Sequence, residues 1–343
     1  MKETKNIVTD HPILSVKDLR VHFFMDEGTV KAVEGASFDV YPGRTLGIVG
    51  ESGCGKSVAT RSILLLVDSP GKIVEGNITY RGAQTNGQET DLTSLKISGS
   101  EIRSIRGGEI SLIFQEPMTS FSPVHSVGNQ MIESIRLHKK LSRSDSKDLA
   151  LDWFQRVGMP NPEQRMTQYP WQLSGGQRQR AMIAMALCCD PKIVIADEPT
   201  TALDVTTQAQ ILDLLKELQE QNGMSIIFIT HDLGVIADIA DDVAVMYLGD
   251  VVESAPVDEI FHSPKHPYTN ALLSSIPSVF NRNRERLPTI SGAIPHPHNR
   301  PSGCTFHTRC PSFIDGVCNV SLPTKSELGD NHSVTCFLYE DKK

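Results

Sequence analysis

The segment Gly50–Ser57, GESGCGKS, constrains the fold of this chain more than any other stretch. It follows a short apolar run, RTLGIVG, and precedes a helical pattern, SVATRSILLLV. Glycines let backbone N–H groups turn inward around an anion, and the N-terminus of a following helix adds partial positive charge. A glycine-rich turn with an incidental lysine is the alternative. The strand before the loop and the helix after it favour a phosphate-binding loop.

The side chains of this loop have separate predicted roles. Lys56 would supply a positive charge to the β- and γ-phosphates, and the Ser57 hydroxyl could ligate Mg²⁺. Cys54 is interpreted as a spacer, because at this position the backbone of the loop, and not the side chain, would contact phosphate. The predicted phosphate-binding residues are Gly50, Glu51, Ser52, Gly53, Cys54, Gly55, Lys56 and Ser57.

Two carboxylates follow a second apolar run, KIVIA at 192–196. Asp197 and Glu198 would lie at the C-terminal end of a strand, where α/β proteins bind their ligands. Asp197 could hold Mg²⁺ through water, and Glu198 could polarise an attacking water as a general base. An acidic cap for the next helix is the alternative reading, but the phosphate loop upstream favours a catalytic role.

A second candidate phosphate site begins at Leu173 in LSGGQRQRAMIAMAL. Ser174, Gly175 and Gly176 precede a helix, whose N-terminus suits an anion, and Gln177 could add a polar contact. One nucleotide does not need two separate cradles unless they close on it from opposite sides. The residues alone leave this duplicate unexplained.

The remaining patterns indicate an α/β core. Alternating residues near the N-terminus predict two antiparallel strands, and short apolar runs predict buried strands. Helical periodicity fills the stretch between the runs ISLIF and KIVIA, and a further helix ends at Asn222-Gly223. This order predicts an α/β core with an N-terminal antiparallel β subdomain and an inserted helical subdomain. After about Pro256 the periodicity fades, which indicates a separate C-terminal extension.

The loop GESGCGKS, the run IVIADE and the sequence LSGGQ together resemble the nucleotide-binding subunit of an ATP-binding cassette (ABC) transporter. The resemblance implies that two subunits dimerise head to tail and sandwich each ATP between one phosphate loop and the partner's LSGGQ. This accounts for the second cradle, formed by Ser174, Gly175, Gly176 and Gln177.

The same resemblance implies further site residues. Gln115 would sense Mg²⁺ and the transmembrane partner, Asp204 would lie at the dimer seam, and His231 would contact the γ-phosphate. Phe23, or its neighbour Phe24, would stack on adenine. The implied catalytic residues are Glu198, His231 and Gln115, and the implied Mg²⁺ ligands are Ser57, Gln115 and Asp197.

Longer segments resemble importers of the dipeptide/oligopeptide type, including IFQEPMTSFSPVHSVGNQ and the tail HSPKHPYTNALLSSIP with GCTFHTRCP. Residues 13–265 would form the ATPase domain, with a helical subdomain at about 116–190, and residues 266–343 the extension. Peptides would be the cargo, although relatives of this type carry oligosaccharides or nickel. The sequence SFSP stands where many relatives have Leu-Asn-Pro, in the region where a permease would dock.

The resemblance also implies partners and a location. The implied partners are a second ATPase subunit, which would be a paralogue in a heterodimer, and two transmembrane permeases. A substrate-binding protein would be an indirect partner. The chain would lie on the cytoplasmic side of the plasma membrane, held through the permeases. Its net charge of −8 argues against a nucleic-acid binder. A soluble ABC ATPase without a transport role is the alternative, but neither a coiled-coil insert nor a second cassette is evident.

Four of the seven cysteines lie in the tail, at Cys304, Cys310, Cys318 and Cys336. No segment suggests secretion, and disulfides are the weaker interpretation in a reducing cytoplasm. Structural zinc usually uses close C-x2–4-C pairs, whereas an iron–sulfur cluster needs four thiolates and tolerates wider spacing. The resemblance implies a [4Fe–4S] cluster here, with Zn²⁺ as the alternative. His307, between two of these cysteines, is interpreted as a packing residue.

Overall fold

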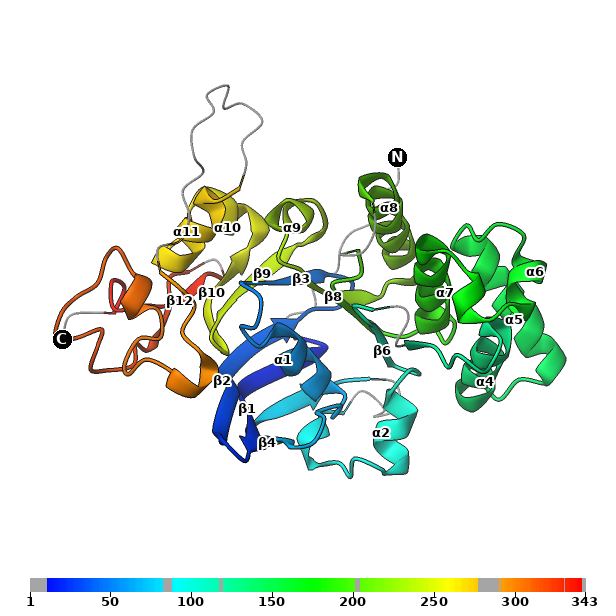
Figure 1. Cartoon of the computed structure of the whole chain (residues 1–343), viewed down its shortest axis with the longest axis horizontal. Coiled ribbons are helices and arrows are strands. Elements are labelled where there is room, and N and C mark those ends of the chain that lie inside the picture. Colours follow the sequence, from blue (N-terminus) through cyan, green and yellow to red (C-terminus); the bar gives the residue numbers. More distant parts are fainter. Residues whose placement is uncertain are drawn as a thin grey trace, which may run out of the picture. The chain divides into compact units, whose positions relative to one another are not determined.

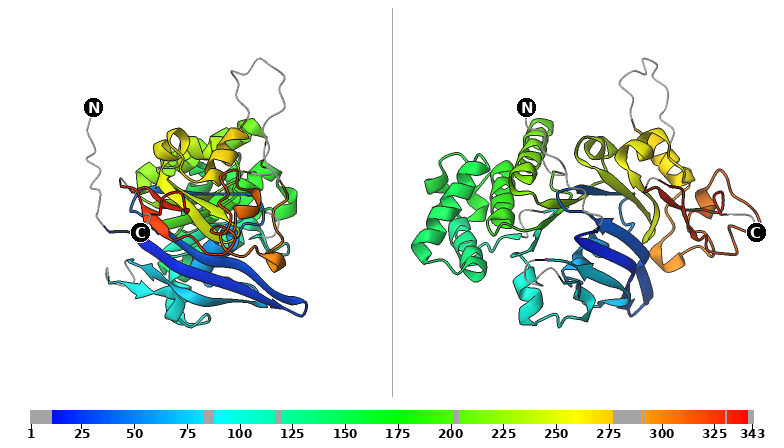
Figure 2. Two further views of the ribbon diagram at one scale, coloured as in Figure 1. Left: turned by 90° about the vertical axis from the view of Figure 1, so that its left-hand side faces the viewer. Right: turned by 180° about the vertical axis from the view of Figure 1, so that it is seen from behind.

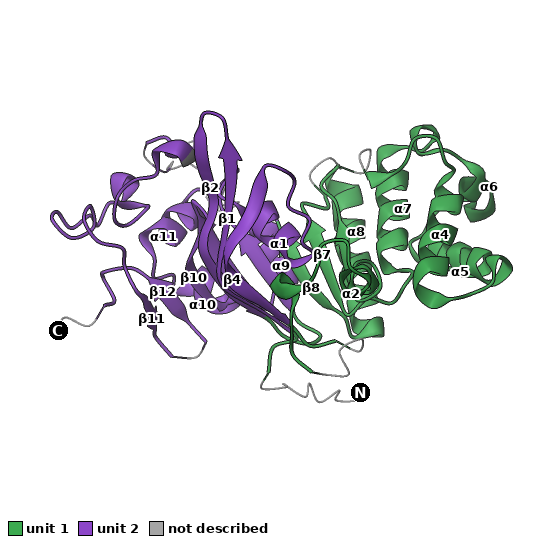
Figure 3. Ribbon diagram, turned by 90° about the horizontal axis from the view of Figure 1, so that it is seen from below, with its two compact units in different colours: residues 1–13, 40–44, 80–229 green, residues 14–39, 45–79, 230–343 purple. Residues whose placement is uncertain are grey.

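The structure is a computed structural model that describes residues 11–82, 88–116, 120–200, 204–276, 290, 292–329 and 331–340. The chain divides into two compact units (Figure 3). Unit 1 contains residues 1–13, 40–44 and 80–229, and unit 2 contains residues 14–39, 45–79 and 230–343. Residues 1–10 lie outside the described part of the chain.

Three parallel strands form the sheet of unit 1: β6 (Ile110–Ile113), β7 (Ile193–Asp197) and β8 (Ser225–Ile229). The central strand β7 pairs with β6 on one side and with β8 on the other. Every residue of β7 and β8 is buried, which confirms the prediction of buried parallel strands from their continuous apolar runs. Between β7 and β8 lies α8 (Val205–Asn222), which ends at Gly223 in a left-handed conformation.

The inserted helices lie between β6 and β7, and Figure 1 shows them as one group in green. They are α4 (Val127–Lys139), α5 (Arg143–Arg156), α6 (Pro162–Thr167) and α7 (Gly175–Leu187). Ser126 and Ser142 cap α4 and α5 through their hydroxyl oxygens. The predicted apolar stripe of α5 is buried at Trp153 and Phe154. Unit 1 also contains two short elements that were not predicted, β5 (Thr90–Asp91) and α2 (Ser100–Ile105).

The N-terminal strands of unit 2 are β1 (Leu14–Met25), β2 (Gly28–Val40) and β4 (Gly71–Tyr80). They lie in the order β2-β1-β4, side by side in both views of Figure 2. Only two residues join β1 to β2, so these strands form a hairpin, as their alternating pattern predicts. Strand β4 was not predicted, because its sequence GKIVEGNITY contains no continuous apolar run.

A second sheet region of unit 2 carries the phosphate loop. Strand β3 (Thr45–Val49) pairs in parallel with β9 (Asp242–Tyr247), and β9 pairs antiparallel with β10 (Asp250–Pro256). Helix α1 (Lys56–Ile63) follows the phosphate loop and contacts β1, and helix α9 (Leu233–Ile239) contacts β3. Helix α1 is shorter than the pattern SVATRSILLLV indicates: it ends at Ile63 because Leu65 adopts a left-handed backbone with φ of 51°.

The C-terminal extension is part of unit 2 and continues its sheet. Strand β12 (Ser333–Thr335) pairs antiparallel with β10 and with β11 (Lys325–Glu327). The helices α10 (Val257–His262) and α11 (Pro267–Ser274) follow β10. The fading of periodicity after Pro256 reflects the length of these elements, which are too short to show a repeating pattern in the sequence.

Candidate functional site

The phosphate loop follows β3 and can be built only with glycine at two of its positions. Gly50 has φ of 152°, and a Cβ added there would lie 2.2 Å from the Met246 carbonyl oxygen. Gly55 has φ of 98°, and its added Cβ would lie 2.3 Å from the Ala32 carbonyl oxygen. Both contacts are closer than any side chain permits. The loop is therefore a tight backbone turn directly before α1, as the sequence predicts.

Lys56 is the first residue of α1, and its side chain folds over the loop. Its Nζ donates to the Gly50 carbonyl at 2.8 Å and to the Glu51 carbonyl at 3.1 Å, and the residue is 5% exposed. The ammonium group is thus held at the centre of the loop. Cys54 is buried, and burial raises the pKa of its thiol, which agrees with its interpretation as a spacer. Ser57 follows Lys56 in the first turn of α1, while Ser52 and Gly53 are exposed.

Glu51 differs from the other residues of the loop, because its backbone and its side chain are both held from outside. Its N–H donates to the Tyr268 hydroxyl at 2.9 Å. Its carboxylate accepts two hydrogen bonds from Arg309, at 2.7 and 3.0 Å. Glu51 was predicted to be part of the phosphate cradle, and neither Tyr268 nor Arg309 was predicted as its partner. No local signal could have revealed them, since Arg309 lies 258 positions away along the chain.

The predicted catalytic carboxylate and the predicted sensor glutamine lie together in unit 1. The Gln115 side-chain amide donates to a Glu198 carboxylate oxygen at 2.9 Å. Glu198 follows β7 directly, with a left-handed φ of 45°, and its N–H donates to the Ile229 carbonyl at the end of β8. Asp197 is the last residue of β7 and is fully buried. The strand end therefore presents Glu198 next to Gln115, a contact that was not predicted from the sequence.

The LSGGQ segment forms the N-terminus of α7 with a complete capping box. The Ser174 hydroxyl accepts from the Gln177 N–H, and the Gln177 side chain accepts from the Ser174 N–H at 3.1 Å. Nothing lies within 4 Å of a Cβ added at Gly175, and at Gly176 only the Thr207 methyl group lies nearby, at 3.4 Å. The first turn of α7 is thus open to an approaching group.

The two remaining residues implied for the dimer and the γ-phosphate are both exposed. Asp204 caps α8, and its hydrogen bonds from the Thr207 backbone N–H and hydroxyl lower its pKa. Residues 201–203, directly before it, lie outside the described part of the chain. His231 lies two residues after the end of β8 and is exposed.

The two candidate adenine-stacking residues lie near the end of β1. Phe23 is partly buried and lies against Gly71. Phe24 is 48% exposed, and the Lys72 ammonium group lies 5.9 Å from its ring centre. Phe24 is therefore the more accessible of the two rings.

All four cysteines of the extension line one small cavity. Its lining includes Cys304, Cys310, Cys318 and Cys336, beside apolar side chains such as Phe306 and Ile314. None forms a disulfide, and burial raises the pKa of Cys304 to about 11. Within the described residues, no group of three or more His, Cys, Asp or Glu side chains is arranged to hold a single metal ion. His307 also lines this cavity, and its Nδ1 lies 2.8 Å from the Cys304 carbonyl oxygen.

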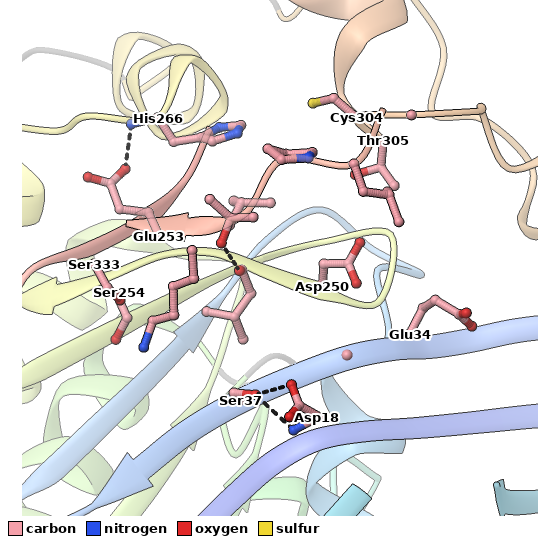
Figure 4. Close-up of a pocket in the computed structure, with 18 of the residues that line it drawn as sticks. Asp18, Glu34, Ser37, Asp250, Glu253, Ser254, His266, Cys304, Thr305 and Ser333 are labelled. Atoms are coloured by element: carbon pink, nitrogen blue, oxygen red, sulfur yellow. Dashed lines mark hydrogen bonds between the residues drawn. The ribbon is translucent and has the colours of Figure 1, made fainter. Parts of the chain in front are cut away.

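A larger cavity in unit 2 lies between β1, β2, β10 and the extension (Figure 4). Its polar side chains bind one another: the Ser37 hydroxyl accepts from the Asp18 N–H at 2.8 Å, and Arg300 pairs with Asp250. Burial raises the pKa of Asp250 to about 6, while Arg300 opposes this shift. Cys304 lines this cavity as well as the four-cysteine cavity. Because these polar groups bind one another, the cavity is interpreted as a structural contact region between the strands and the extension and not as a ligand site.

Residues 33–201 match the ABC transporter family, and residues 252–318 match the oligopeptide/dipeptide transporter C-terminal region. The chain is 47% identical to the dipeptide transport ATP-binding protein DppD of Bacillus subtilis, over 96% of each chain. It is 44% identical to the Escherichia coli protein of the same name, over 94% of this chain and 96% of that one.

Among solved structures, a dimeric ATP-binding cassette bound to ADP and phosphate is similar, with a TM-score of 0.62 and 26% identity. The match covers 71% of this chain and 98% of that one. This chain belongs to the ABC transporter family, as an ATP-binding subunit of the dipeptide/oligopeptide type. It is an ATPase with the cassette fold that the sequence predicts. Within the described residues, no helix is long and apolar enough to span a membrane.

Proposed function

We propose that this chain hydrolyses ATP to power the uptake of peptides through a membrane complex. The observation that carries the proposal is the similarity to dipeptide transport proteins along 96% of the chain, which includes the C-terminal region as well as the cassette. Oligosaccharides and nickel are the alternative cargoes. The substrate would reach the permeases from a binding protein and would not contact this chain.

The residues of the site fit the binding of a nucleoside triphosphate. Gly50 and Gly55 allow the loop to turn tightly against neighbouring backbone, in a conformation whose N–H groups could meet phosphate oxygens, and Lys56 would neutralise phosphate charge. Ser57, Asp197 and Gln115 would hold Mg²⁺, which supplies positive charge to the phosphate oxygens. Glu198 would accept a proton from the attacking water, in an orientation set by its hydrogen bond with Gln115. His231 would contact the γ-phosphate.

The second subunit would complete each ATP site. In this arrangement Ser174, Gly175, Gly176 and Gln177 face the ATP that is bound to the partner's phosphate loop, and Asp204 lies at the seam. The open first turn of α7 and the exposure of Asp204 support such a role. We propose that the partner is a paralogue of this chain in a heterodimer.

The permease would dock on the helical subdomain, near SFSP at Ser120–Pro123. A groove there is lined by apolar side chains, which include Val124 and Ile132, and by polar and basic ones, which include Arg143. Trp171 is 60% exposed, stacks on Tyr169 and donates its indole N–H to the Pro123 carbonyl. An exposed aromatic pair beside a groove suits an apolar partner helix. The chain would thus be held at the cytoplasmic face of the membrane through two permeases.

Uptake in cells tests the cargo. A strain that lacks this chain should lose nearly all import of a labelled dipeptide or oligopeptide through this system, and the intact gene should restore it. Labelled nickel and oligosaccharides serve as the competing cargoes. Loss of nickel or oligosaccharide uptake with unchanged peptide uptake would contradict the proposal of peptides.

We further propose that the four cysteines of the extension hold a [4Fe–4S] cluster, with Zn²⁺ as the alternative. The support is their convergence on one cavity as free thiols, which matches the four thiolates that such a cluster needs. The burial that raises the thiol pKa values would be offset by ligation, because a metal favours the thiolate form. The cluster would have a structural or redox-sensing role, with no part in ATP chemistry.

Metal analysis of protein purified without oxygen tests this site. The intact chain should be brown and contain about four irons. Cys310→Ser should bleach the colour and make the segment after Pro295 sensitive to protease, because ligand loss removes folding energy there. Cys189→Ser, at a buried cysteine outside the cavity, is the matched control and should keep the iron. Colourless protein with one zinc per chain would reject the cluster.

A further inference from the structure

Glu51 places a negative charge inside a loop that binds an anion. An unpaired carboxylate at this position would repel the phosphates of ATP, and the repulsion would be strong because the site is partly shielded from water. The Glu51 side chain is 22% exposed, so solvent screens its charge only in part. The loop therefore needs a cation that neutralises Glu51.

Arg309 is that cation, and it comes from the C-terminal extension. Its guanidinium group makes two parallel hydrogen bonds to the two Glu51 carboxylate oxygens, the geometry in which arginine binds carboxylates most strongly. The Arg309 side chain is 3% exposed, and its guanidinium lies over the Tyr247 ring. An arginine guanidinium stays protonated in proteins, so this charge is permanent.

The surroundings of Arg309 fix its position. It ends a short 3-10 turn at His307–Arg309, directly before Cys310, and its N–H donates to the Phe306 carbonyl at 3.0 Å. The Phe306 ring is buried against Tyr247 and Tyr268, with ring centres 5.2 and 5.3 Å away. Because the Tyr268 hydroxyl accepts the Glu51 N–H, one aromatic cluster supports both contacts to the loop.

We propose that Arg309 is a positioning residue for the phosphate loop: it neutralises Glu51 and orients that side chain, so that ATP affinity depends on the C-terminal extension. This inference rests on the proposed role of Gly50–Ser57 in binding ATP. It does not depend on what the four cysteines bind.

Titration of purified protein with a fluorescent ATP analogue tests the proposal. Arg309→Met keeps the length of the buried side chain and removes its charge, and it should weaken ATP binding roughly tenfold. The KM for ATP should rise in the assembled complex, while kcat at saturating ATP should change much less. The double variant Arg309→Met/Glu51→Gln should regain most of the ATP affinity, because no unpaired carboxylate then remains in the loop.

The double variant separates charge neutralisation from simple structural damage. If Arg309→Met only disrupted the fold of the extension, Glu51→Gln would not rescue ATP binding. Arg309→Lys should give an intermediate affinity, because it keeps the charge and loses the paired hydrogen bonds. Lys325→Met removes an equal charge from an exposed ion pair of the same extension and should leave the affinity unchanged.

Each outcome is decisive. Unchanged affinity in Arg309→Met, or a loss that Glu51→Gln does not restore, would overturn the proposal. Lys56→Ala, measured in the same assay, reports on the loop itself. If Lys56→Ala and Arg309→Met both bind ATP normally, the proposed role of the loop is wrong as well. If only Lys56→Ala loses affinity, the loop binds ATP and the role of Arg309 alone is rejected.

Discussion

Glu198→Gln is expected to slow ATP hydrolysis by about two to three orders of magnitude while ATP binding is kept. The amide cannot accept a proton from water, yet it has almost the same shape and can still bind Gln115. The variant should also accumulate as a closed dimer in the presence of ATP, because hydrolysis is what reopens the proposed sandwich. Phosphate release and size-exclusion chromatography with ATP measure the two effects.

Glu217→Gln is the matched control for this prediction. Glu217 is an exposed carboxylate on α8 that accepts a hydrogen bond from Gln221, so its loss makes the same change in charge in the same unit. Its ATPase rate should equal that of the unchanged protein. A Glu198→Gln protein that hydrolyses ATP at a near-normal rate would show that the base lies elsewhere.

Lys56→Ala should lose affinity for ATP about 10- to 100-fold, because it removes a charged donor from the centre of the phosphate loop. Turnover should fall with it, since the same charge would stabilise the transition state. The two Lys56 hydrogen bonds to the loop carbonyls would also be lost, so the loop itself should become less ordered. Direct titration of the nucleotide separates weaker binding from slower chemistry.

Lys17→Ala serves as the control for this change in charge. Lys17 is exposed on β1, and its removal should leave ATP binding unchanged. Equal affinity in Lys56→Ala and in the unchanged protein would exclude the assigned contact between Lys56 and phosphate.

The elements that could be predicted are those whose environment is uniform along their length. The strands β7 and β8 are buried on both faces, so the stretches IVIA at 193–196 and IIFI at 226–229 are apolar throughout. Helix α8 is long enough to show its apolar stripe, which the structure buries at Ile211, Leu214, Leu215 and Leu218. A strand that is buried along its whole length, or a helix that is buried on one face over several turns, has an apolar pattern that can be recognised in the sequence.

The elements that were missed depend on distant pairing. Strands β11 and β12 have only three residues each, KSE and SVT, and they exist because β12 pairs with β10. The early end of α1 was also missed, because the left-handed backbone at Leu65 interrupts a run of five apolar residues, ILLLV, that looks helical. Neither feature has a local pattern that a single sequence displays.

The candidate site shows the same division. The glycines of the phosphate loop and the acidic pair at the end of β7 were predictable, because their local chemistry requires those residue types at those positions. The contact between Glu51 and Arg309 was not, because a buried ion pair is set by the fold and not by spacing along the chain. Recognition of LSGGQ supplied what local chemistry left unexplained, the reason for a second phosphate cradle.

The most direct test of the proposed function is ATP-driven uptake into vesicles. The chain would be reconstituted with its paralogue, both permeases and the binding protein, with ATP supplied on the side that carries the ATPase subunits. Labelled dipeptide should accumulate with ATP and Mg²⁺ but not with ADP, and uptake should fall together with hydrolysis when Glu198→Gln replaces this chain. Peptide accumulation that continues undiminished with the Glu198→Gln chain, or ATP hydrolysis with no peptide uptake at all, would contradict the account.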